Sequence, residues 1–344
     1  MMRSLVITKQ GDPVTPNVEL IELPDPTPGP DEVLVATEAS ALNHLDLWTG
    51  RGLPGIDTTW PHIGGSDGCG TVIEVGQSVD PSWVGRRVVL NAALTVQTAS
   101  SPDSAPAGRN LWMIGEHGPG THAERFCAPA SNVLAIPDAV SSTDAAAYGL
   151  THLTAWRMLR TRGQLREGET VLITGIGGGV ALACLNIANH FGCRTIVTSR
   201  HQWKLDKAIA LGAHDAVLDE GKDWSRAVRK MTGKRGVDVC ADSIGQAVHL
   251  ACIGSLARGG RFVTCGCTTG PAATTDLSRI FWNQLAILGS TMGDMDEFRS
   301  VIALLGAGRL APVIDQVVEA ADGVNAFSQL EAGAQFGKIV LTWT

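Results

Sequence analysis

The densest glycine cluster of the chain is Gly175-Ile176-Gly177-Gly178-Gly179-Val180-Ala181. An apolar strand candidate, residues 170–174, precedes the cluster directly, and a helical pattern follows it. A dinucleotide pyrophosphate needs this arrangement, because residues without a Cβ let phosphates approach the backbone and the N–H groups at a helix start point at them. Such a cluster could also be an ordinary tight turn, but the strand–helix repeats behind it favour a dinucleotide. The residues predicted to hold the pyrophosphate are Gly177, Gly178, Gly179 and Val180.

The end of the next strand candidate predicts which dinucleotide is bound. An NAD-binding domain usually carries Asp or Glu there, about 20 residues after the glycines, to bind the ribose 2′-hydroxyl. Here the segment contains Ser199, Arg200 and Lys204, and the nearest acid, Asp206, lies inside the following helix. A hydroxyl and two cations suit a 2′-phosphate, so NADP(H) is the predicted cofactor. The alternative is that both cations are solvated charges at a helix start.

The elements that must position these residues change in character near residue 150. Before it, short strands such as 32–37, 70–75 and 86–90 are broken by proline and glycine, which suggests a barrel or sandwich. After residue 168, apolar strand candidates alternate with helical segments, which specifies an α/β doubly wound parallel sheet. These candidates are 170–174, 195–198, 216–218, 237–241, 261–265 and 286–288. Two further strands, 313–318 and 338–343, could extend that sheet or rejoin the first domain.

Composition excludes several classes of protein. The chain has 344 residues and a net charge of −7 without a long basic run, which argues against nucleic-acid binding. The nearly uncharged window 171–188 is interpreted as a buried strand, glycine turn and helix rather than a membrane span. The eight cysteines show no C-x-x-C spacing, and the apolar stretch near Met1 is too short for the hydrophobic region of a signal peptide. We therefore expect a reduced, cytoplasmic protein that acts on a small molecule; residues 98–109 are predicted to form an exposed loop.

Further motifs lie along nearly the whole chain. They are Asn43-His44-Leu45-Asp46, Gly64-Gly65-Ser66-Asp67-Gly68, Val84-Gly85-Arg86-Arg87-Val88, Gly120-Thr121-His122-Ala123-Glu124, Leu153-Thr154-Ala155-Trp156, Leu211-Gly212-Ala213, Gly259-Gly260-Arg261 and Gly337-Lys338-Ile339-Val340-Leu341. In this order they resemble the medium-chain dehydrogenase/reductase superfamily, the alcohol dehydrogenase and quinone oxidoreductase relatives. The resemblance implies a GroES-like β-barrel catalytic domain from residues 1–150 and 311–344, and a Rossmann domain from residues 151–310. The active site is expected between them.

The chain departs from the zinc-dependent members of that superfamily. Those members carry a cysteine at the start of the first motif, Gly-His-Glu in the second, and a third ligand four residues before the threonine that matches Thr154. This chain has Asn43, Ser66 with Asp67, and Leu150 at those places, and these are poor zinc ligands or none. The proton-relay hydroxyl falls on Leu45, and residues 70–126 contain no cysteine for a structural zinc. We predict no metal; the alternative is a different site built from His44, Asp46, Asp67, His117, His122 and His152.

The resemblance also implies roles for single residues. Asn43 is expected either to hold the substrate oxygen or to be a structural amide, and Asp46 is a catalytic candidate that more often anchors local backbone. Thr154 is expected at the nicotinamide and His44 at the pyrophosphate. Trp48 and Trp60 could stack a flat substrate or simply fill a core. Further cofactor contacts are expected from Gly266, Cys267, Ser290 and Thr291, whereas Cys265 and Cys267 have poor spacing for a disulfide.

Loss of zinc narrows the chemistry. Without a metal to polarise a plain ketone, hydride transfer is easier to a quinone or an α,β-unsaturated carbonyl, where negative charge delocalises. We therefore predict an NADPH-dependent oxidoreductase acting on such acceptors, with solvent as the proton source. The alternatives are a metal-free NADP-dependent alcohol or carbonyl dehydrogenase, and a non-catalytic dinucleotide-binding protein. The apolar segment 280–291 matches the region through which relatives pair their cofactor domains, so a homodimer is expected.

Overall fold

The computed structural model describes residues 1–95 and 111–343, so the predicted loop at 98–109 lies outside the described residues. The chain divides into two compact units. The first consists of Met1–Leu150 and Gly293–Thr344, and the second of Thr151–Met292. The first unit is discontinuous in sequence, and the first boundary between the units falls inside helix α2 (Ser142–Trp156).

The return to the first unit occurs earlier than predicted, at Gly293 rather than at residue 311. The reason is helix α8 (Met295–Gly306), which belongs to the first unit. The Tyr148 hydroxyl donates to the Val301 carbonyl oxygen at 3.1 Å, and the Asn91 amide donates to the Gly293 carbonyl oxygen at 3.3 Å. The sequence patterns predict no element between the strand candidates 286–288 and 313–318, so this helix and its place in the first unit come from the structure alone.

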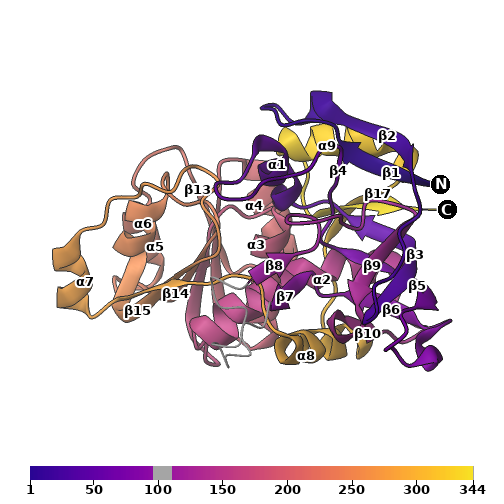
Figure 1. Cartoon of the computed structure of the whole chain (residues 1–344). Helices are drawn as coiled ribbons and strands as arrows, with labels where there is room; N and C mark the ends of the chain where they lie inside the picture. The colour runs from indigo at the N-terminus through magenta and orange to yellow at the C-terminus, as the bar shows by residue number, and fades with distance from the viewer. Residues whose placement is uncertain (96–110, 344) are drawn as a thin grey trace. The chain divides into compact units, whose positions relative to one another are not determined.

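The second unit confirms the doubly wound sheet (Figure 1). Its strands run in the order β13-β12-β11-β14-β15-β16, and every neighbouring pair is parallel. The strands are β11 (Thr170–Ile173), β12 (Arg194–Ser199), β13 (Asp215–Leu218), β14 (Val237–Asp242), β15 (Leu256–Thr264) and β16 (Ala286–Gly289). Strand order reverses between β11 and β14, so the carboxyl ends of these two strands flank the crevice in which such sheets bind ligands.

The connecting helices bury an apolar core against this sheet. They are α3 (Gly179–His190), α4 (Gln202–Ala210), α5 (Ser225–Met231), α6 (His249–Ser255) and α7 (Leu277–Asn283), with the π-helical turn η5 (Arg157–Arg162) after α2. Leu172, Cys240 and Phe262 of the strands pack with Val228 of α5 and Ile253 of α6. The apolar window 171–188 is thereby divided into strand, turn and helix, as predicted. Among the described residues, no helix combines the length and apolar character needed to cross a membrane.

The first unit is built from β-strands with short helices. Its main sheet has the order β10-β6-β5-β3-β18-β17, with β9 also paired to β3, and a smaller sheet has the order β2-β1-β4. The bounds are β1 (Met2–Ile7), β2 (Val18–Leu23), β3 (Glu32–Ala41), α1 (His44–Arg51), β4 (His62–Ile63), β5 (Gly68–Val75), β6 (Arg87–Leu90), β7 (Ala93–Thr95), β8 (Leu111–Met113), β9 (Arg125–Pro129), β10 (Val133–Ala135), β17 (Ile314–Glu319), α9 (Gly323–Glu331) and β18 (Lys338–Thr342). The described part of this unit also contains the short 3-10 turns η1 (Thr15–Asn17), η2 (Pro81–Trp83), η4 (Ala130–Asn132) and η6 (Ala320–Asp322).

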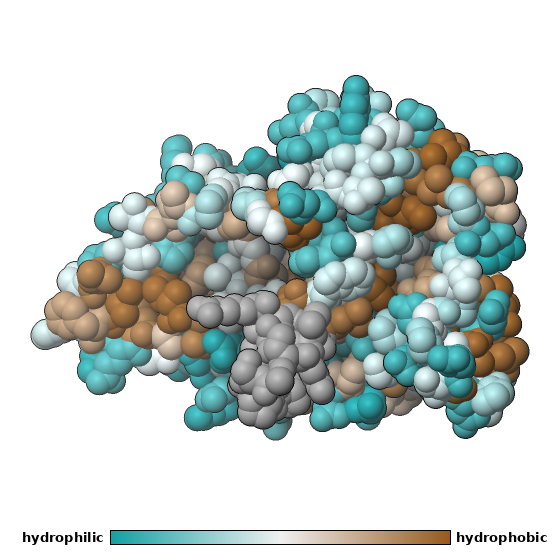
Figure 2. All heavy atoms as spheres, viewed as in Figure 1, coloured by the Kyte–Doolittle hydropathy of each residue, from teal (hydrophilic) through white to brown (hydrophobic). Residues whose placement is uncertain are grey.

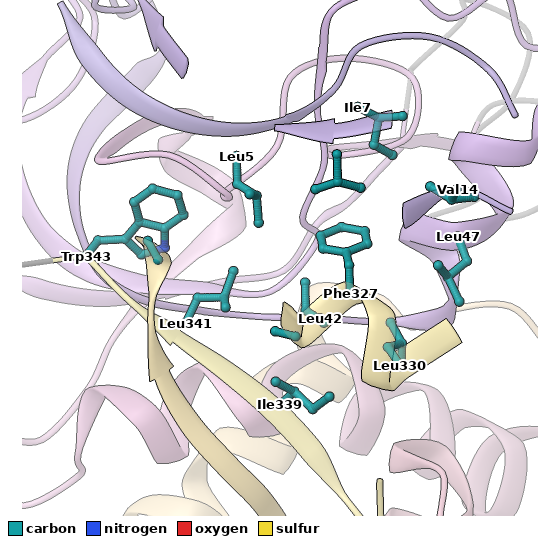
Figure 3. Close-up of a cluster of buried hydrophobic side chains, with 13 residues drawn as sticks. Leu5, Ile7, Val14, Leu42, Leu47, Phe327, Leu330, Ile339, Leu341 and Trp343 are labelled. Carbon is teal, nitrogen blue, oxygen red and sulfur yellow. The ribbon is translucent and has the colours of Figure 1, made fainter. Parts of the chain in front are cut away.

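The C-terminal strands join the sheet of the first unit, which settles the choice left open by periodicity. Strand β18 pairs antiparallel with β3, with Val340 opposite Ala41. Alternate residues from Ile339 to Trp343 enter a core with Leu5 of β1 and Phe327 of α9 (Figure 3). Because side chains alternate across a strand, Lys338 points to the opposite face from this core. The end of the chain therefore supplies both a hydrophobic anchor and a buried cation.

Candidate functional site

The glycine turn lies at the carboxyl end of β11 and leads into α3. The Ile176 N–H donates to the Thr198 carbonyl oxygen at 2.8 Å, which ties the turn to β12. Gly177 has φ +117, a conformation that favours glycine. Gly178 is the N-cap of α3, no side chain caps the helix, and its first turn, which begins with Gly179 and Val180, carries no acid. This helix start therefore fits an anionic phosphate.

The side chain of Lys204 lies against this turn. A methyl group built on Gly177 would be 2.7 Å from Lys204 Cδ and 3.4 Å from its Nζ. Lys204 is largely buried, and its Nζ also lies 5.2 Å from the centre of the Trp203 ring. The sequence places Lys204 in the helix after β12, and in the fold its side chain contacts the glycine turn after β11.

The two other residues at the end of β12 have different surroundings. Arg200 is exposed. Ser199 is buried, and its hydroxyl oxygen accepts the His201 N–H at 3.2 Å, which fixes the start of α4. Asp206, the nearest acid, accepts the Gln202 amide at 2.8 Å on the exposed face of α4. Of the two cations predicted to follow β12, Lys204 therefore lies against the glycine turn and Arg200 is exposed.

Four more predicted cofactor residues follow β15 and β16 at the same edge of the sheet. Gly266 is half-buried, and Cys267 and Thr291 are exposed. The Ser290 N–H donates to the Thr264 carbonyl oxygen at 2.9 Å, and its buried hydroxyl has no hydrogen-bond partner among the described residues. Cys265 and Cys267 are both free thiols, and burial raises the pKa of Cys265 to about 12. Thr154 of α2 is also in this unit, with its hydroxyl 3.7 Å from Met292 Sδ.

In the first unit, Asp46 anchors the start of α1. Its carboxylate accepts the Asn43 N–H at 2.7 Å and the Gly65 N–H at 2.8 Å, and His122 Nε2 lies 3.5 Å away. Burial raises the pKa of Asp46, but His122 and the two N–H donors outweigh burial and hold that pKa below its usual range. The geometry makes Asp46 a positioning residue, and a part for it in the chemistry stays a prediction.

His122 has its own partner behind it. Trp343 Nε1 donates to the Ser40 hydroxyl oxygen at 2.9 Å, and that hydroxyl lies 2.9 Å from His122 Nδ1. Since the indole N–H can only donate, the Ser40 hydroxyl keeps its own proton available for the contact with Nδ1. Ser40, His122 and Asp46 are fully buried, so these contacts lie inside the first unit and support its structure.

A second buried network joins Asn43, Asp67 and Lys338. Lys338 is 4% exposed, and its Nζ donates to Asn43 Oδ1 at 2.5 Å, to Asp67 Oδ2 at 2.9 Å and to the Leu42 carbonyl oxygen at 2.8 Å. The Asn43 amide donates to Asp67 Oδ2 at 2.9 Å and to the Ala41 carbonyl oxygen at 3.2 Å. The Leu150 N–H donates to Asp67 Oδ1 at 2.7 Å.

This network brings together positions that are far apart in the sequence, and every donor in it has an acceptor. Both amide hydrogens of Asn43 are already used, so a hydrogen bond to a substrate oxygen would have to displace one of these contacts. Lys338 was missed as a functional candidate. The available signal was one lysine inside an otherwise apolar strand pattern, because a buried lysine requires acceptors.

The two tryptophans of α1 and the loop after it differ in their contacts. Trp48 is half-buried, with its ring centre 6.4 Å from that of His44, one turn earlier on α1. Trp60 is half-buried, packs against the core shown in Figure 3, and lies 6.2 Å from the His62 ring. His44 and Trp48 therefore share one face of α1, whereas Trp60 already has a structural role.

Comparisons with known proteins place this geometry in a family. The alcohol dehydrogenase GroES-like domain matches residues 29–138, and the zinc-binding dehydrogenase domain matches residues 179–307. The zinc-type alcohol dehydrogenase-like protein YogA of Leptosphaeria maculans is 31% identical over 333 residues, which cover 92% of each chain. The chain belongs to the medium-chain dehydrogenase/reductase superfamily. It is therefore a dinucleotide-binding oxidoreductase fold of the α/β class, a GroES-like domain with a Rossmann domain, as the motifs predicted.

Other members of the superfamily are similar over nearly the full chain. Crotonyl-CoA reductase of Streptomyces avermitilis is 27% identical over 374 residues, which cover 96% of this chain and 83% of the relative. A crystal structure of an NAD-dependent alcohol dehydrogenase superposes with a TM-score of 0.90 at 36% identity, covering 99% of both chains. These relatives differ in the reactions that their names describe, so membership leaves substrate and cofactor preference open.

The residues at the expected zinc position do not fit the metal that the family name implies. Asn43 and Asp67 already satisfy the Lys338 ammonium, the Ser66 hydroxyl donates to the Ile114 carbonyl oxygen at 2.7 Å, and Leu150 contributes only its backbone N–H. Zinc in proteins is bound by thiolate, imidazole and carboxylate groups that are free to coordinate. Across residues 1–95 and 111–343, no three His, Cys, Asp or Glu side chains are grouped as metal ligands, so the alternative site from His44 to His152 is not assembled there.

Proposed function

We propose that this protein is a zinc-independent oxidoreductase that uses NADPH to reduce a quinone or an α,β-unsaturated carbonyl. The observation that carries the proposal is the Asn43–Asp67–Lys338 network, in which the Lys338 ammonium donates to oxygen atoms of two residues that stand where zinc-dependent members carry ligands. An acceptor whose negative charge delocalises needs less electrostatic stabilisation than a simple ketone, so hydrogen-bond donors suffice.

The preference for NADPH rests on the end of β12. Lys204 lies against the glycine turn, Arg200 is exposed at the end of β12, and the position where NAD-binding sheets carry an acid is Ser199. Two cations and no carboxylate favour a ligand with an additional phosphate. When bound, NADPH would supply the hydride. Gly177, Gly178, Gly179 and Val180 would hold its pyrophosphate.

The remaining proposed roles follow from the hydrogen-bonding groups and ring faces that are not already used in the structure. The Ser290 hydroxyl is a buried group with donor capacity after β16, and Thr291, Gly266 and Cys267 also follow the carboxyl ends of β16 and β15. Thr154 is proposed at the nicotinamide and His44 at the pyrophosphate. Trp48 is the better candidate for stacking a flat substrate, because Trp60 is used in the core. Asn43 and Asp46 are proposed to position these groups.

The test is an initial-rate comparison on protein dialysed against a chelator. NADPH oxidation is measured with a conjugated enone, with the matching saturated ketone and with a quinone, and each assay is repeated with NADH. We expect turnover of the enone or quinone with NADPH and little turnover of the ketone. Activity that disappears on dialysis and returns with zinc would contradict zinc independence, and equal affinity for NADH and NADPH would contradict the cofactor preference.

A second candidate function is metal-free oxidation of an alcohol or reduction of a simple carbonyl. The similarity to a structure named NAD-dependent alcohol dehydrogenase, at 36% identity over nearly the whole chain, favours this candidate. Running the same protein with primary and secondary alcohols plus NAD⁺ or NADP⁺ separates the two. Dinucleotide binding without turnover of any acceptor would instead favour a non-catalytic role.

We also propose that the protein forms a homodimer through α7 and β16. Leu277, Phe281 and Trp282 of α7 are 73%, 69% and 71% exposed, and apolar side chains gather over this helix (Figure 2). Strand β16 is an edge of its sheet and exposes Ile287. A second copy of the chain fits best, because a two-fold axis would pair β16 and α7 of one copy with the same elements of the other copy. Light scattering should give a dimeric mass that becomes monomeric in a Phe281→Glu/Trp282→Glu variant; a monomeric wild type would end the proposal.

A further inference from the structure

A buried carboxylate, Asp242, lies at the carboxyl end of β14, on the edge where the sheet order reverses. Asp242 is the last residue of β14 and is 1% exposed. Asp242 Oδ1 accepts the Thr174 hydroxyl at 2.6 Å and the Ile244 N–H at 3.2 Å, and Oδ2 accepts the Gly245 N–H at 3.0 Å. One carboxylate therefore holds both the end of β11 and the loop that follows β14.

On one side, these contacts reach the glycine turn. Thr174 immediately precedes Gly175, whose φ is +61. A methyl group built on Gly175 would lie only 2.4 Å from Ile244 Cδ1, so the Ile244 side chain closely covers the start of the turn. By holding Thr174 and Ile244 together, Asp242 sets the position of the first glycine of the pyrophosphate-binding segment.

On the other side, the same loop is bonded to the turn after β15. Gly245 has φ +86, and a methyl group there would lie 2.7 Å from Cys267 Cα. The Gln246 N–H donates to the Gly270 carbonyl oxygen at 3.1 Å, and the Thr269 N–H donates to the Ile244 carbonyl oxygen at 2.8 Å. The segment with Gly266 and Cys267, proposed to contact the cofactor, is thus joined to Asp242 through this loop.

We propose that Asp242 is a positioning residue for the dinucleotide, which fixes the spacing between the glycine turn after β11 and the turn after β15. The inference rests on the proposed cofactor site. A dinucleotide spans this edge of the sheet, so the distance between the two turns must be correct before both can contact it. A displacement of about 1 Å in a positioning group can cost about a hundredfold in rate.

The electrostatics agree with this position. Burial raises the pKa of Asp242, and the Thr174 hydroxyl and the N–H groups of Gly245 and Ile244 offset only part of that effect. A carboxyl group whose negative charge is disfavoured, and whose oxygens are covered by three donors, repels an anionic ligand less than a free carboxylate would.

The test compares Asp242→Asn with Asp238→Asn. Asp238 is a matched control, because it lies on the same strand, and its carboxylate also accepts a backbone N–H of β11, that of Thr170 at 2.9 Å. It lies at the amino end of the strand, away from the cofactor edge. An asparagine has a single oxygen, so each variant loses acceptor capacity for a backbone donor without a change of size.

For Asp242→Asn we expect the Kd for NADPH to rise about tenfold or more, whereas Asp238→Asn should bind almost as the wild type does. Tm values measured on both variants correct for a general loss of stability. A second pair, Thr174→Val and Thr174→Ser, removes and restores the hydroxyl that joins Asp242 to β11. Valine should weaken binding, and serine should recover it.

The outcomes separate the two proposals. If wild type binds neither NADPH nor NADH, the proposed function fails. If wild type binds and Asp242→Asn binds as tightly as Asp238→Asn at a matched Tm, or if Thr174→Val binds as tightly as Thr174→Ser, the positioning role is overturned while the cofactor proposal stands.

Discussion

The two polar clusters of this protein are built in opposite ways. At the carboxyl edge of the parallel sheet, the glycine turn leads into α3, which starts without a side-chain cap and without an acid in its first turn. In the first unit, Asn43, Asp67 and Lys338 satisfy one another, with the remaining bonds made to backbone groups. The first arrangement has capacity to bind a ligand. The second has little capacity left, so it acts as a rigid scaffold at a position where relatives named for zinc would be expected to hold a metal.

The difference follows from the chemistry of the groups. A helix start keeps unpaired N–H donors that water can satisfy until an anion replaces it. A buried ammonium group must be paired within the protein itself, because an unpaired charge in a protein interior is costly. The following variants break one cluster or the other and should give different kinds of loss.

The largest effect is expected from Lys338→Met, which leaves Asp67 buried without its cation. Breaking a buried pair in this way costs about 3–5 kcal/mol in the free energy of unfolding, measured by urea denaturation. Lys222→Met, which removes an exposed lysine, should have little effect. The Asp67→Leu/Lys338→Met double variant should recover much of the loss, because neither charge remains. A loss below about 1 kcal/mol for Lys338→Met would mean that the network contributes little.

Lys204→Gln tests the ligand-binding cluster. We expect the Kd for NADPH to rise about tenfold to a hundredfold, the loss of one charge-assisted contact, while the Kd for NADH stays nearly unchanged. Lys207→Gln is the matched control, because Lys207 Nζ lies at the same 5.2 Å from the Trp203 ring centre as Lys204 Nζ. Fluorescence titration of the reduced cofactors provides the measurement. An equal loss for both cofactors would contradict a role in reading the 2′-phosphate.

Asp46→Asn should weaken the first unit in a pH-dependent way. Asparagine has one oxygen for two backbone donors, so we expect a loss of about 1–3 kcal/mol near neutral pH. The pKa of Asp46 is lowered in the folded protein, so its carboxylate stabilises the fold above the unfolded value of about 3.9, and that stabilisation is lost as pH falls through the lowered pKa. The difference between wild type and variant should therefore shrink on acidification; a difference that is constant with pH would exclude the ionised carboxylate as the cause.

The smallest expected effect is the protection of the Cys267 thiol from alkylation when the cofactor binds. Its thiol is exposed, whereas burial raises the pKa of Cys265 to about 12, so iodoacetamide at mildly alkaline pH should label Cys267 and spare Cys265. Saturating NADPH should slow labelling of Cys267 severalfold, as followed by peptide mass spectrometry. Labelling that is unaffected by a cofactor known to bind would place Cys267 outside the site.

Much of the cofactor unit could be predicted because its signals are local. An apolar strand followed by glycines and a helix is contiguous in sequence, and each of the six predicted strands appears within a few residues of its expected bounds. The contacts of Lys204 with Gly177 and of Asp242 with Thr174 were not predictable in this way. They join residues on different strands and helices, and no periodicity encodes which side chains meet at the edge of a sheet.

The sequence by itself determined the class of fold, the glycine turn between a strand and a helix, and the residue types at the positions where zinc-dependent relatives carry ligands. Only the tertiary structure decided what takes up the polar groups at those positions, because Lys338 reaches Asn43 and Asp67 through the pairing of β18 with β3. It also decided that α8 belongs to the first unit and that Asp242 links two turns. The sequence gives the type of each residue, but the partners of a buried charge depend on which distant strands pair and in which register.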